Sequence, residues 1–505
     1  MLNTINPANL TISHPQWVGL MPLVIVTLGV LLSMLLGTVP FGATKERPHG
    51  GRLPVFLFSL AIMVGSAAWT CTHWIHEPMQ LFGGMMTLDY FSSFFFVLLS
   101  ASTALVMLGS YSYLEGGEIH FSEFYPIMMS ATLGMMLLAC ATELLTIFIA
   151  LELMSLMVYV LVGMRRMSSF SNEASIKYFV MGGVAAAVYL YGTALIYGAL
   201  NTTKLGGILT ALAHEQSVLG NPILVAGVVL LMVGFFFKIA AAPFHMWTPD
   251  VYEGAPANVT SYMATVLKAA VFAALVRVSV SLFGDQGVHL LGNLQGVAHA
   301  VLWWLALLTM IIGNFVALMQ TSLKRLMAYS AIAHTGYLLI GLLAGPSVGY
   351  SGIVFYLVAY VAMNIGAFIL LTLFPGKDDE GLTLAGLAGL GKRHPLVAAA
   401  LTVFLLSLGG FPPTAGFVGK YYMFSGALAA GETTLVLIAV LTSAVSVFYY
   451  LRLVVLMYME DGREIASFRS SGFAYAAIAI CLLLTMYYGL LPGSLLHAVK
   501  KAAVF

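Results

Sequence analysis

The chain has 505 residues, of which 60% are hydrophobic and 8% charged, and its formal net charge is +1. Soluble domains carry about 25% charged residues, so this composition excludes a water-soluble protein and requires lipid as the solvent. The balanced charge gives no support for a nucleic-acid partner, and Cys71, Cys140 and Cys481 are too scattered to ligate an iron–sulfur cluster in this chain alone.

Fourteen apolar runs follow one another along the chain, and a helix that crosses a membrane needs about 20 such residues. They predict an all-α polytopic membrane protein with about 14 transmembrane helices. No Lys or Arg precedes the first run, so we interpret it as a retained span and not as a signal peptide. The runs cover residues 17–39, 53–70, 91–113, 124–141, 143–164, 177–199, 222–241, 257–282, 299–320, 326–344, 350–374, 396–431, 434–457 and 473–495.

Two of these spans carry residues that break helices. The run 396–431 is too long for one straight helix and holds a Gly-Gly-Phe-Pro-Pro sequence at 409–413. Pro243 follows the run 222–241, and a proline cannot donate the backbone hydrogen bond that a helix interior needs. Because irregular backbone inside a membrane is tolerated only where it lines protein or water, we predict a broken helix at each position.

The two breaks recur five spans apart, each with a lysine nearby, and this pattern predicts two inverted five-helix repeats with one broken helix in each. The repeats are inferred from the breaks and the charges, since the two halves share little other sequence. The predicted units are 1–123 with spans 1–3, 124–282 with spans 4–8, 299–457 with spans 9–13, and 473–505 with span 14 and a tail.

Basic residues alternate between the loops. Loops after odd-numbered spans hold twelve of the 21 Lys and Arg residues, whereas loops after even-numbered spans and the tails hold three. The positive-inside rule then predicts that both termini lie on the non-cytoplasmic side. The twelve are Lys45, Arg47, Arg52, Arg165, Arg166, Lys324, Arg325, Lys377, Lys392, Arg393, Arg463 and Arg469, and the three are Lys204, Lys500 and Lys501.

Six basic residues lie within or at the edges of spans. An ionisable side chain near the bilayer centre costs about 2.5–3.5 kcal/mol, so it faces a bundle interior or a wet cavity and marks a functional site. Arg277 lies near the outer end of its span, and we expect it to reach outward to the lipid headgroups. The six are Lys177, Lys238, Lys268, Arg277, Lys420 and Arg452.

Two charges in neighbouring spans predict an ion pair. Glu152 lies well inside the run 143–164 with apolar residues on both sides, and its side chain is too short to reach the membrane surface. Lys177 opens the next run, where it is either an end residue that reaches the headgroups or the partner of Glu152, which would keep both ionised. Glu143 fits an interfacial carboxylate at a helix start as well as it fits a functional residue, so no firm role is assigned to it.

Three lysines and two histidines complete the candidate pathway. Lys238 and Lys420 stand beside the two breaks and Lys268 lies near the middle of span 8, so each is placed to meet water and to change its protonation state. His245 and His334 could relay protons near neutral pH, although a histidine that only packs between helices fits each position as well. Haem ligation would need paired histidines on facing helices, which the sequence does not supply.

Five motifs resemble the antiporter-like membrane subunits of proton-pumping NADH-quinone oxidoreductase (respiratory complex I) and of the related multi-subunit cation/proton antiporters. They cover most of 140–425, and residues 248–256 are similar to the version found in the subunit N branch. A lysine at 420 and the lack of a long C-terminal lateral helix also fit that branch. The motifs are LELMS (151–155), EASIKY (173–178), FKIAAAPFHMWTPDVYEGAP (237–256), KRLMAYSAIAH (324–334) and GGFPPTAGFVGK (409–420).

The resemblance implies roles for the matching residues. Glu152 would pair with Lys177, Lys238 would be the central switch, Lys268 would lead towards the second half, and Lys420 would face the outer exit. It also implies a subunit that moves protons but holds no cofactor: the flavin, the iron–sulfur clusters and the quinone are expected in partner subunits. Sister antiporter-like subunits and small helical subunits are the expected partners, in a bacterial inner membrane.

Two other function classes remain open. A subunit of a multi-subunit Na⁺/H⁺ antiporter would use the same fold and the same lysines, and only residues 248–256 and the surroundings of Lys420 argue against it. A quinone- or haem-binding membrane anchor would need a quinone site or paired histidines within this chain, and the histidine pattern argues against that class.

Overall fold

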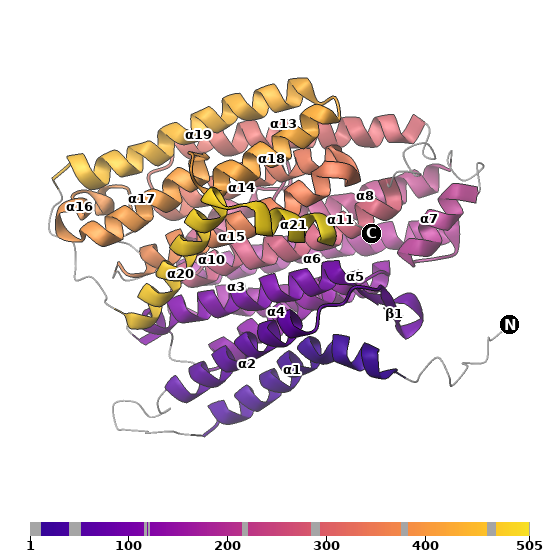
Figure 1. Ribbon diagram of the computed structural model, residues 1–505, viewed down its shortest axis with the longest axis horizontal. Helices are drawn as coiled ribbons and strands as arrows, with labels where there is room; N and C mark the ends of the chain where they lie inside the picture. The colour runs from indigo at the N-terminus through magenta and orange to yellow at the C-terminus, as the bar shows by residue number, and fades with distance from the viewer. Residues whose placement is uncertain are drawn as a thin grey trace.

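The structure is a computed structural model that describes residues 12–39, 52–115, 119, 122–214, 221–283, 293–374, 382–461 and 471–503. It is a bundle of long helices with one two-stranded antiparallel hairpin, β1 (Met79–Leu81) and β2 (Met86–Leu88) (Figure 1). The α-helices are α1 (His14–Gly37), α2 (Leu53–Thr72), α3 (Tyr90–Glu115), α4 (Phe124–Cys140), α5 (Leu144–Val162), α6 (Ser169–Leu200), α7 (Leu205–His214), α8 (Pro222–Lys238), α9 (Trp247–Gly254), α10 (Ala257–Tyr262), α11 (Lys268–Phe283), α13 (Asn293–Leu318), α14 (Leu323–Leu343), α15 (Tyr350–Thr372), α16 (Leu390–Arg393), α17 (Pro395–Gly409), α18 (Ala415–Ala429), α19 (Thr433–Met459), α20 (Gly472–Leu490) and α21 (Gly493–Ala502). Short 3₁₀ segments are η2 (Phe82–Gly84) and η7 (Ala385–Leu387), and single π-turns are η4 (Met263–Leu267) and η5 (Gly345–Gly349).

The predicted all-α membrane fold is confirmed. Among the described residues, eleven helices are long and apolar enough to cross a membrane, counting α10 to α11 as one, and three shorter apolar helices, α4, α8 and α17, join them. These make up the fourteen predicted spans. Of the basic loop residues, Lys45, Arg47, Lys377, Arg463 and Arg469 lie outside the described part of the chain. The division into two repeats of five spans stays a prediction.

Two boundaries differ from the prediction. Helix α6 begins at Ser169, eight residues before the predicted start, because the Ser168 side chain accepts a hydrogen bond from the Ser171 amide and caps the helix. Lys177 therefore lies inside the helix and not at its first turn. The predicted tail after span 14 contains helix α21, which starts after Pro492 and carries Lys500 and Lys501 in its last turn.

Both predicted breaks are present. Residues 239–246 interrupt the span formed by α8 and α9, and residues 410–414 interrupt the span formed by α17 and α18. Ala240 has a φ of 59°, a left-handed conformation that is uncommon for a residue with a side chain. Gly410 has a φ of 86°, which glycine adopts without steric cost.

The loops that follow even-numbered spans meet at one end of the bundle, and those that follow odd-numbered spans meet at the other. Thr142 donates its amide to the Met85 carbonyl, and Leu205 donates its amide to the Thr142 carbonyl, so the connections after spans 2, 4 and 6 are joined. At the other end, Ser322 pairs with Thr383 and joins the connections after spans 9 and 11. Figure 1 shows the hairpin and α7 at one end of the long axis and α16 at the other. The arrangement matches the alternation of the basic loops.

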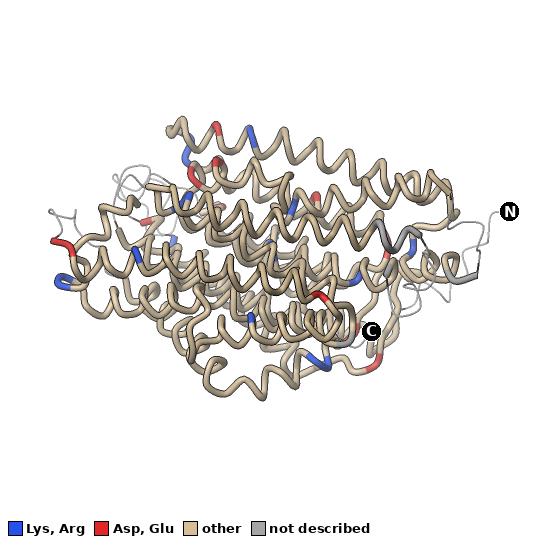
Figure 2. The backbone as a smooth tube through the Cα atoms, turned by 90° about the horizontal axis from the view of Figure 1, so that it is seen from above, with Lys and Arg blue, Asp and Glu red and all other residues tan. Residues whose placement is uncertain are grey.

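The centre of the bundle is formed by α10, α11, α14 and α15, which are almost completely buried, whereas only about a third of the residues of α2, α6 and α20 are buried. Figure 2 shows that the backbone carries few charged residues and that several lie along its length, away from both ends. Those interior charges need partners from the protein, because an uncompensated buried charge is expensive.

Candidate functional site

Lys238 is the last residue of α8, where the first break begins, and only 3% of it is exposed. Its Nζ donates a hydrogen bond of 2.7 Å to Ser155 Oγ and a longer one of 3.5 Å to Tyr159 Oη, both on α5. The ammonium also lies 5.8 Å from the centre of the Tyr159 ring, which adds a cation–π contact. Lys238 therefore points into the protein and not to the membrane surface.

Other side chains satisfy the backbone groups that the first break leaves open. Trp247 Nε1 donates to the Phe237 carbonyl at 3.0 Å, and the Ala242 amide donates to Thr309 Oγ1 on α13 at 2.9 Å. Such groups would otherwise lack partners at the end of a helix. The break is thus held by polar contacts at membrane depth.

Glu152 lies on α5 near Lys238. It is one turn before Ser155, which accepts the Lys238 hydrogen bond, and its carboxylate is within electrostatic range of Lys238. The side chain is half-buried, and its Oε1 is buried without a hydrogen-bond partner among the described residues. The structure therefore brings Glu152 to Lys238.

The predicted ion pair between Glu152 and Lys177 is absent from this structure, which corrects the prediction. Lys177 Nζ instead lies 2.7 Å from the Glu173 carboxylate and 2.9 Å from the Asp250 carboxylate, and 41% of the Lys177 side chain is exposed. Glu173 is one turn away on the same helix, while Asp250 reaches Lys177 because the first break turns α9 towards α6. Asp250 also accepts a hydrogen bond of 2.9 Å from Arg325 Nη1 on α14.

Lys268 lies on α11 just after the single π-turn Met263–Leu267, and only 2% of it is exposed. Its Nζ donates to the Ala331 carbonyl and, at 2.9 Å, to Thr335 Oγ1, both on α14. Thr335 Oγ1 donates in turn to the Ile239 carbonyl in the first break at 2.8 Å. One threonine thus connects Lys268 to the residue that follows Lys238.

His334 is next to Thr335 and is buried inside the second half. Its two ring nitrogens share hydrogen bonds with the hydroxyls of Tyr356 and Tyr450, the latter at 3.3 Å, and Ser330 Oγ bonds the same Tyr450 hydroxyl. The ring is within electrostatic range of both Lys268 and Lys420. His334 therefore lies on the polar path between the two lysines.

Lys420 lies on α18 beside the second break, and 5% of it is exposed. Its Nζ donates to the carbonyls of Leu408 and Gly409 at 3.0 and 3.2 Å and to Ser443 Oγ at 2.9 Å. Those carbonyls end α17, where the helix dipole is negative and attracts a cation. A Cβ added to Gly410 would lie 3.0 Å from Lys420 Cδ, so glycine there leaves room for the lysine.

The polar path continues from Lys420 towards His334. The ammonium lies 5.0 Å from the centre of the Tyr337 ring. Tyr337 Oη accepts from Asn314 Nδ2 at 3.0 Å, and Tyr449 Oη donates to Asn314 Oδ1 at 3.3 Å. The rings of Tyr449 and Tyr450 pack at a tilt of 58°, with their centres 4.5 Å apart. We call Lys238, Thr335, Lys268, His334 and Lys420, with the tyrosines and Asn314 between them, the lysine array.

His245 does not join the lysine array. It is half-buried in the turn between α8 and α9, and it makes none of the hydrogen bonds described above for the lysines. Glu143 is buried at the start of α5, where its carboxylate accepts hydrogen bonds from Thr146 and Thr203 at 3.0 and 2.8 Å. That arrangement is an end-of-helix role, one of the two that the sequence left open.

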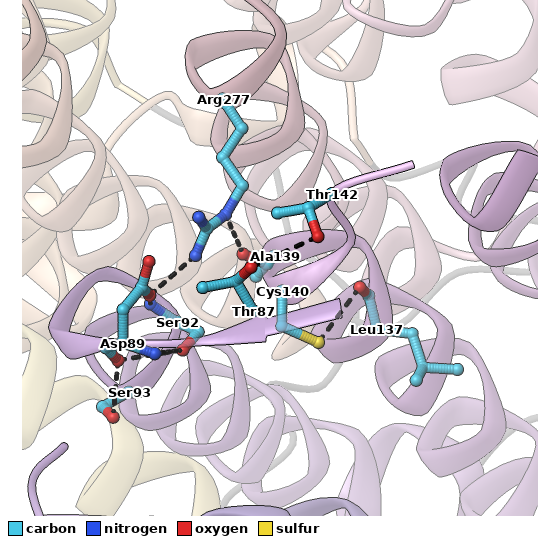
Figure 3. A network of polar contacts seen from close by, with 9 residues as sticks. All are labelled: Thr87, Asp89, Ser92, Ser93, Leu137, Ala139, Cys140, Thr142 and Arg277. Carbon is cyan, nitrogen blue, oxygen red and sulfur yellow. Dashed lines mark hydrogen bonds and ion pairs between the residues drawn. The ribbon is translucent and has the colours of Figure 1, made fainter. Parts of the chain in front are cut away.

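The prediction that Arg277 reaches outward to the lipid headgroups is wrong. The side chain is 5% exposed, its Nη2 lies 2.7 Å from the Asp89 carboxylate, and its Nε donates to the Ala139 carbonyl at 2.7 Å (Figure 3). The guanidinium also lies 4.8 Å from the centre of the Phe91 ring. Asp89 and the end of α4 together draw the cation inward.

Several residues of the array gave no signal in the sequence. Thr335, Asn314 and the buried tyrosines are neutral, and neutral polar residues also occur in spans for packing alone. Asp250 was visible only as part of a motif, and nothing in that motif indicates that it faces α6. A search for hydroxyls spaced one turn from a predicted buried charge would have found Ser155.

The sequence has close relatives among characterised families. Residues 141–446 match the family described as NADH:quinone oxidoreductase/Mrp antiporter, TM. NADH-quinone oxidoreductase subunit N of Trichlorobacter lovleyi is 45% identical over 86% of this chain and 87% of the relative. NADH-quinone oxidoreductase subunit N 1 of Sorangium cellulosum is 39% identical over 97% of this chain and 98% of the relative.

Solved structures share the fold. A chain of respiratory complex I from Thermus thermophilus has a TM-score of 0.78 and 35% identity, with 95% of this chain and all of that chain covered. A chain of the Mrp complex from Dietzia sp. also has a TM-score of 0.78, but at 21% identity, over 96% of this chain and 97% of its own, it shows the fold alone. The chain therefore belongs to the NADH-quinone oxidoreductase subunit N family of antiporter-like membrane proteins.

Proposed function

We propose that this chain is a proton-translocating membrane subunit of NADH:quinone oxidoreductase and that protons move along the lysine array. The observation that carries the proposal is the array itself, in which three lysines are each less than 6% exposed. Thr335 bridges Lys268 to the carbonyl after Lys238, and His334 with its tyrosine partners lies between Lys268 and Lys420. Lysine suits this role because its ammonium releases a proton readily when it is partly desolvated. Arginine would not, because its guanidinium keeps its proton.

Exchange of partners at Glu152 would drive the first transfer. A carboxylate beside Lys238 favours the protonated lysine. If Lys177 left Asp250 and paired with Glu152 instead, that carboxylate would no longer compensate Lys238, which would then favour release of a proton towards Lys268. The contacts of Lys177 with Glu173 and Asp250 are half-exposed, so their rupture costs little.

The remaining features of the proposal follow from the family and from the loop charges. Both termini would lie on the non-cytoplasmic side of a bacterial inner membrane, and protons would leave near Lys420. Flavin, iron–sulfur clusters and quinone would be held by partner subunits, among them sister antiporter-like subunits and small helical subunits. The names of the relatives favour this enzyme over a multi-subunit Na⁺/H⁺ antiporter, whose fold is shared.

The test is the assembled complex purified with Lys238→Ala. We expect proton translocation per NADH oxidised to fall, while NADH oxidation continues in the partner subunits. Arg452→Ala is the matched control, because it removes an exposed cation from α19 outside the lysine array. Undiminished proton translocation in the Lys238→Ala complex would remove Lys238 from the mechanism.

A further inference from the structure

A polar cavity of about 410 Å³ lies at the end of the bundle that carries the hairpin. Its rim includes the exposed residues Gly83, Lys204 and Gly206, and its deeper wall includes Thr142 and Arg277. We call it the outer cavity, because the proposed orientation of the chain places this end on the non-cytoplasmic side. About half of its lining is polar and its rim is open, so water can enter it from that side.

Arg277 is fixed where the outer cavity meets the interior of the bundle. Figure 3 shows its guanidinium between Asp89 and the Ala139 carbonyl at the end of α4. Asp89 is itself held, because its carboxylate accepts the Ser92 amide at 2.7 Å and its amide donates to Ser92 Oγ at 2.8 Å. Phe91 covers the guanidinium at 4.8 Å. The arginine has little freedom to swing aside.

An apolar stretch separates Arg277 from the lysine array. Lys268 and Arg277 lie on the same helix, about 13 Å apart along its axis. The eight residues between them, 269–276, are all apolar and at most 1% exposed. Water in the outer cavity therefore meets the guanidinium of Arg277 first and, behind it, a helix segment that carries no polar side chain.

We propose that Arg277 closes the outer cavity and keeps external protons out of the lysine array. Its guanidinium is well suited to this, because it holds its proton at all physiological pH values and cannot pass one on. Asp89 compensates part of its charge, so the barrier depends on the guanidinium filling the passage while keeping its proton, as an arginine does in other narrow polar passages. Protons that reach Lys268 would then continue through Thr335 and His334 to the second half and would not leave at this end. The inference rests on the proposed function, since a barrier matters only if the array conducts.

The first experiment measures passive leakage. The assembled complex with Arg277→Gln is placed in proteoliposomes, a potassium diffusion potential is imposed without NADH, and proton entry is followed with a pH-sensitive dye. We expect entry at least about tenfold faster than for the wild-type complex. Lys204→Gln is the matched control, because it removes the rim charge and leaves the wall of the cavity intact, and its leakage should equal that of the wild type. An Arg277→Gln complex that admits protons no faster than the wild-type complex would overturn the proposal.

A second experiment needs neither proton pumping nor the loss of Arg277. Ser281 lies on the cavity wall, and Ala273 lies one turn before Arg277 in the apolar segment 269–276. The two variants are Ser281→Cys and Ala273→Cys. Each is introduced with Cys71→Ser, which removes an exposed native thiol, and a membrane-impermeant cationic thiol reagent is added to each side in turn. Peptides of this chain are then analysed by mass spectrometry.

We expect labelling at position 281 from one side and none at position 273. Labelling at both positions would show that water passes Arg277, and labelling at neither would show that the cavity is closed to solvent; each result would overturn the proposal. Because this readout is independent of transport, it separates a failure of the barrier from a failure of the proposed proton pathway.

Discussion

Thr335→Val tests the connection between the first break and Lys268. The threonine hydroxyl accepts from Lys268 Nζ at 2.9 Å and donates to the Ile239 carbonyl at 2.8 Å. Valine has nearly the same shape, so the substitution removes the hydroxyl without opening a cavity. Lys268 would keep only its bond to the Ala331 carbonyl, and the Ile239 carbonyl in the break would lose its donor.

The size of the effect follows from those two bonds. A hydrogen bond to a charged group contributes about 1.5–3 kcal/mol, and every 1.36 kcal/mol is a factor of ten in rate. If the hydroxyl stabilises the transfer between Lys238 and Lys268 to that extent, the step slows by between about tenfold and about a hundredfold. Valine fills the same volume, so we expect the fold to persist with a loss of about 1–3 kcal/mol for the buried Ile239 carbonyl that no longer has its donor.

The assay compares proton uptake with NADH oxidation in proteoliposomes that contain the assembled complex. We expect Thr335→Val to lower the number of protons moved per NADH oxidised and Thr335→Ser, which keeps the hydroxyl, to retain it. A Thr335→Val complex that assembles and moves as many protons per NADH as the wild type would refute the view that protons pass this threonine.

Two further predictions use matched pairs within the chain. In Gly182→Ala, the new Cβ would lie 2.1 Å from Tyr159 Oη, so the tyrosine must move away from Lys238; we expect reduced proton translocation and a loss of about 1–3 kcal/mol in stability. In Gly183→Ala the new Cβ meets nothing within 4 Å, so proton translocation and stability should stay unchanged. Equal effects of Gly182→Ala and Gly183→Ala would count against a role for the Tyr159 contact. Asp250→Asn removes ion pairs to Lys177 and Arg325, which are partly exposed, and should lower the unfolding temperature of the complex only slightly. Asp461→Asn is its control: the Lys392 ammonium lowers the pKa of the Asp461 carboxyl, but the pair is on the surface and its loss should leave the unfolding temperature unchanged.

The number of spans and the two breaks could be predicted from the sequence because both depend on local properties. A span is an uninterrupted apolar run, and proline or paired glycines end it wherever they occur. The start of α6 could not be found in this way, because its first two turns are polar and a hydropathy argument recognises only apolar residues. The serine at position 168 was the local signal that would have marked it.

The candidate site was predictable residue by residue but not in its pairings. Lys238, Lys268 and Lys420 are buried as predicted, since a charge in an apolar span has few other places to go. Which groups they contact depends on how the spans pack, and the sequence carries no local trace of that packing. Lys177 was assigned to Glu152 because the two spans are neighbours, yet the break in span 7 turns α9 back and presents Asp250 to Lys177 at 2.9 Å.

The prediction for Arg277 was wrong for the same reason. Position near a span end predicts an outward side chain when the only alternative is lipid. Here the hairpin between spans 2 and 3 folds over the end of the bundle and offers Asp89, so the inward position has a carboxylate partner. Contacts between residues 188 positions apart in the chain lie beyond any local pattern.

One physical requirement connects the breaks, the lysines and the arginine. A helix end that is buried in the protein leaves carbonyl groups without donors unless a side chain supplies them. Lys420 satisfies the end of α17, Arg277 satisfies the end of α4, and Thr335 satisfies the carbonyl that follows Lys238. The donor at each site decides what the site can do: a lysine or a hydroxyl can give up a proton and receive another, whereas an arginine cannot. Under the proposed function and the proposed barrier, the same structural need is therefore met by side chains that conduct along the lysine array and by one that closes the outer cavity.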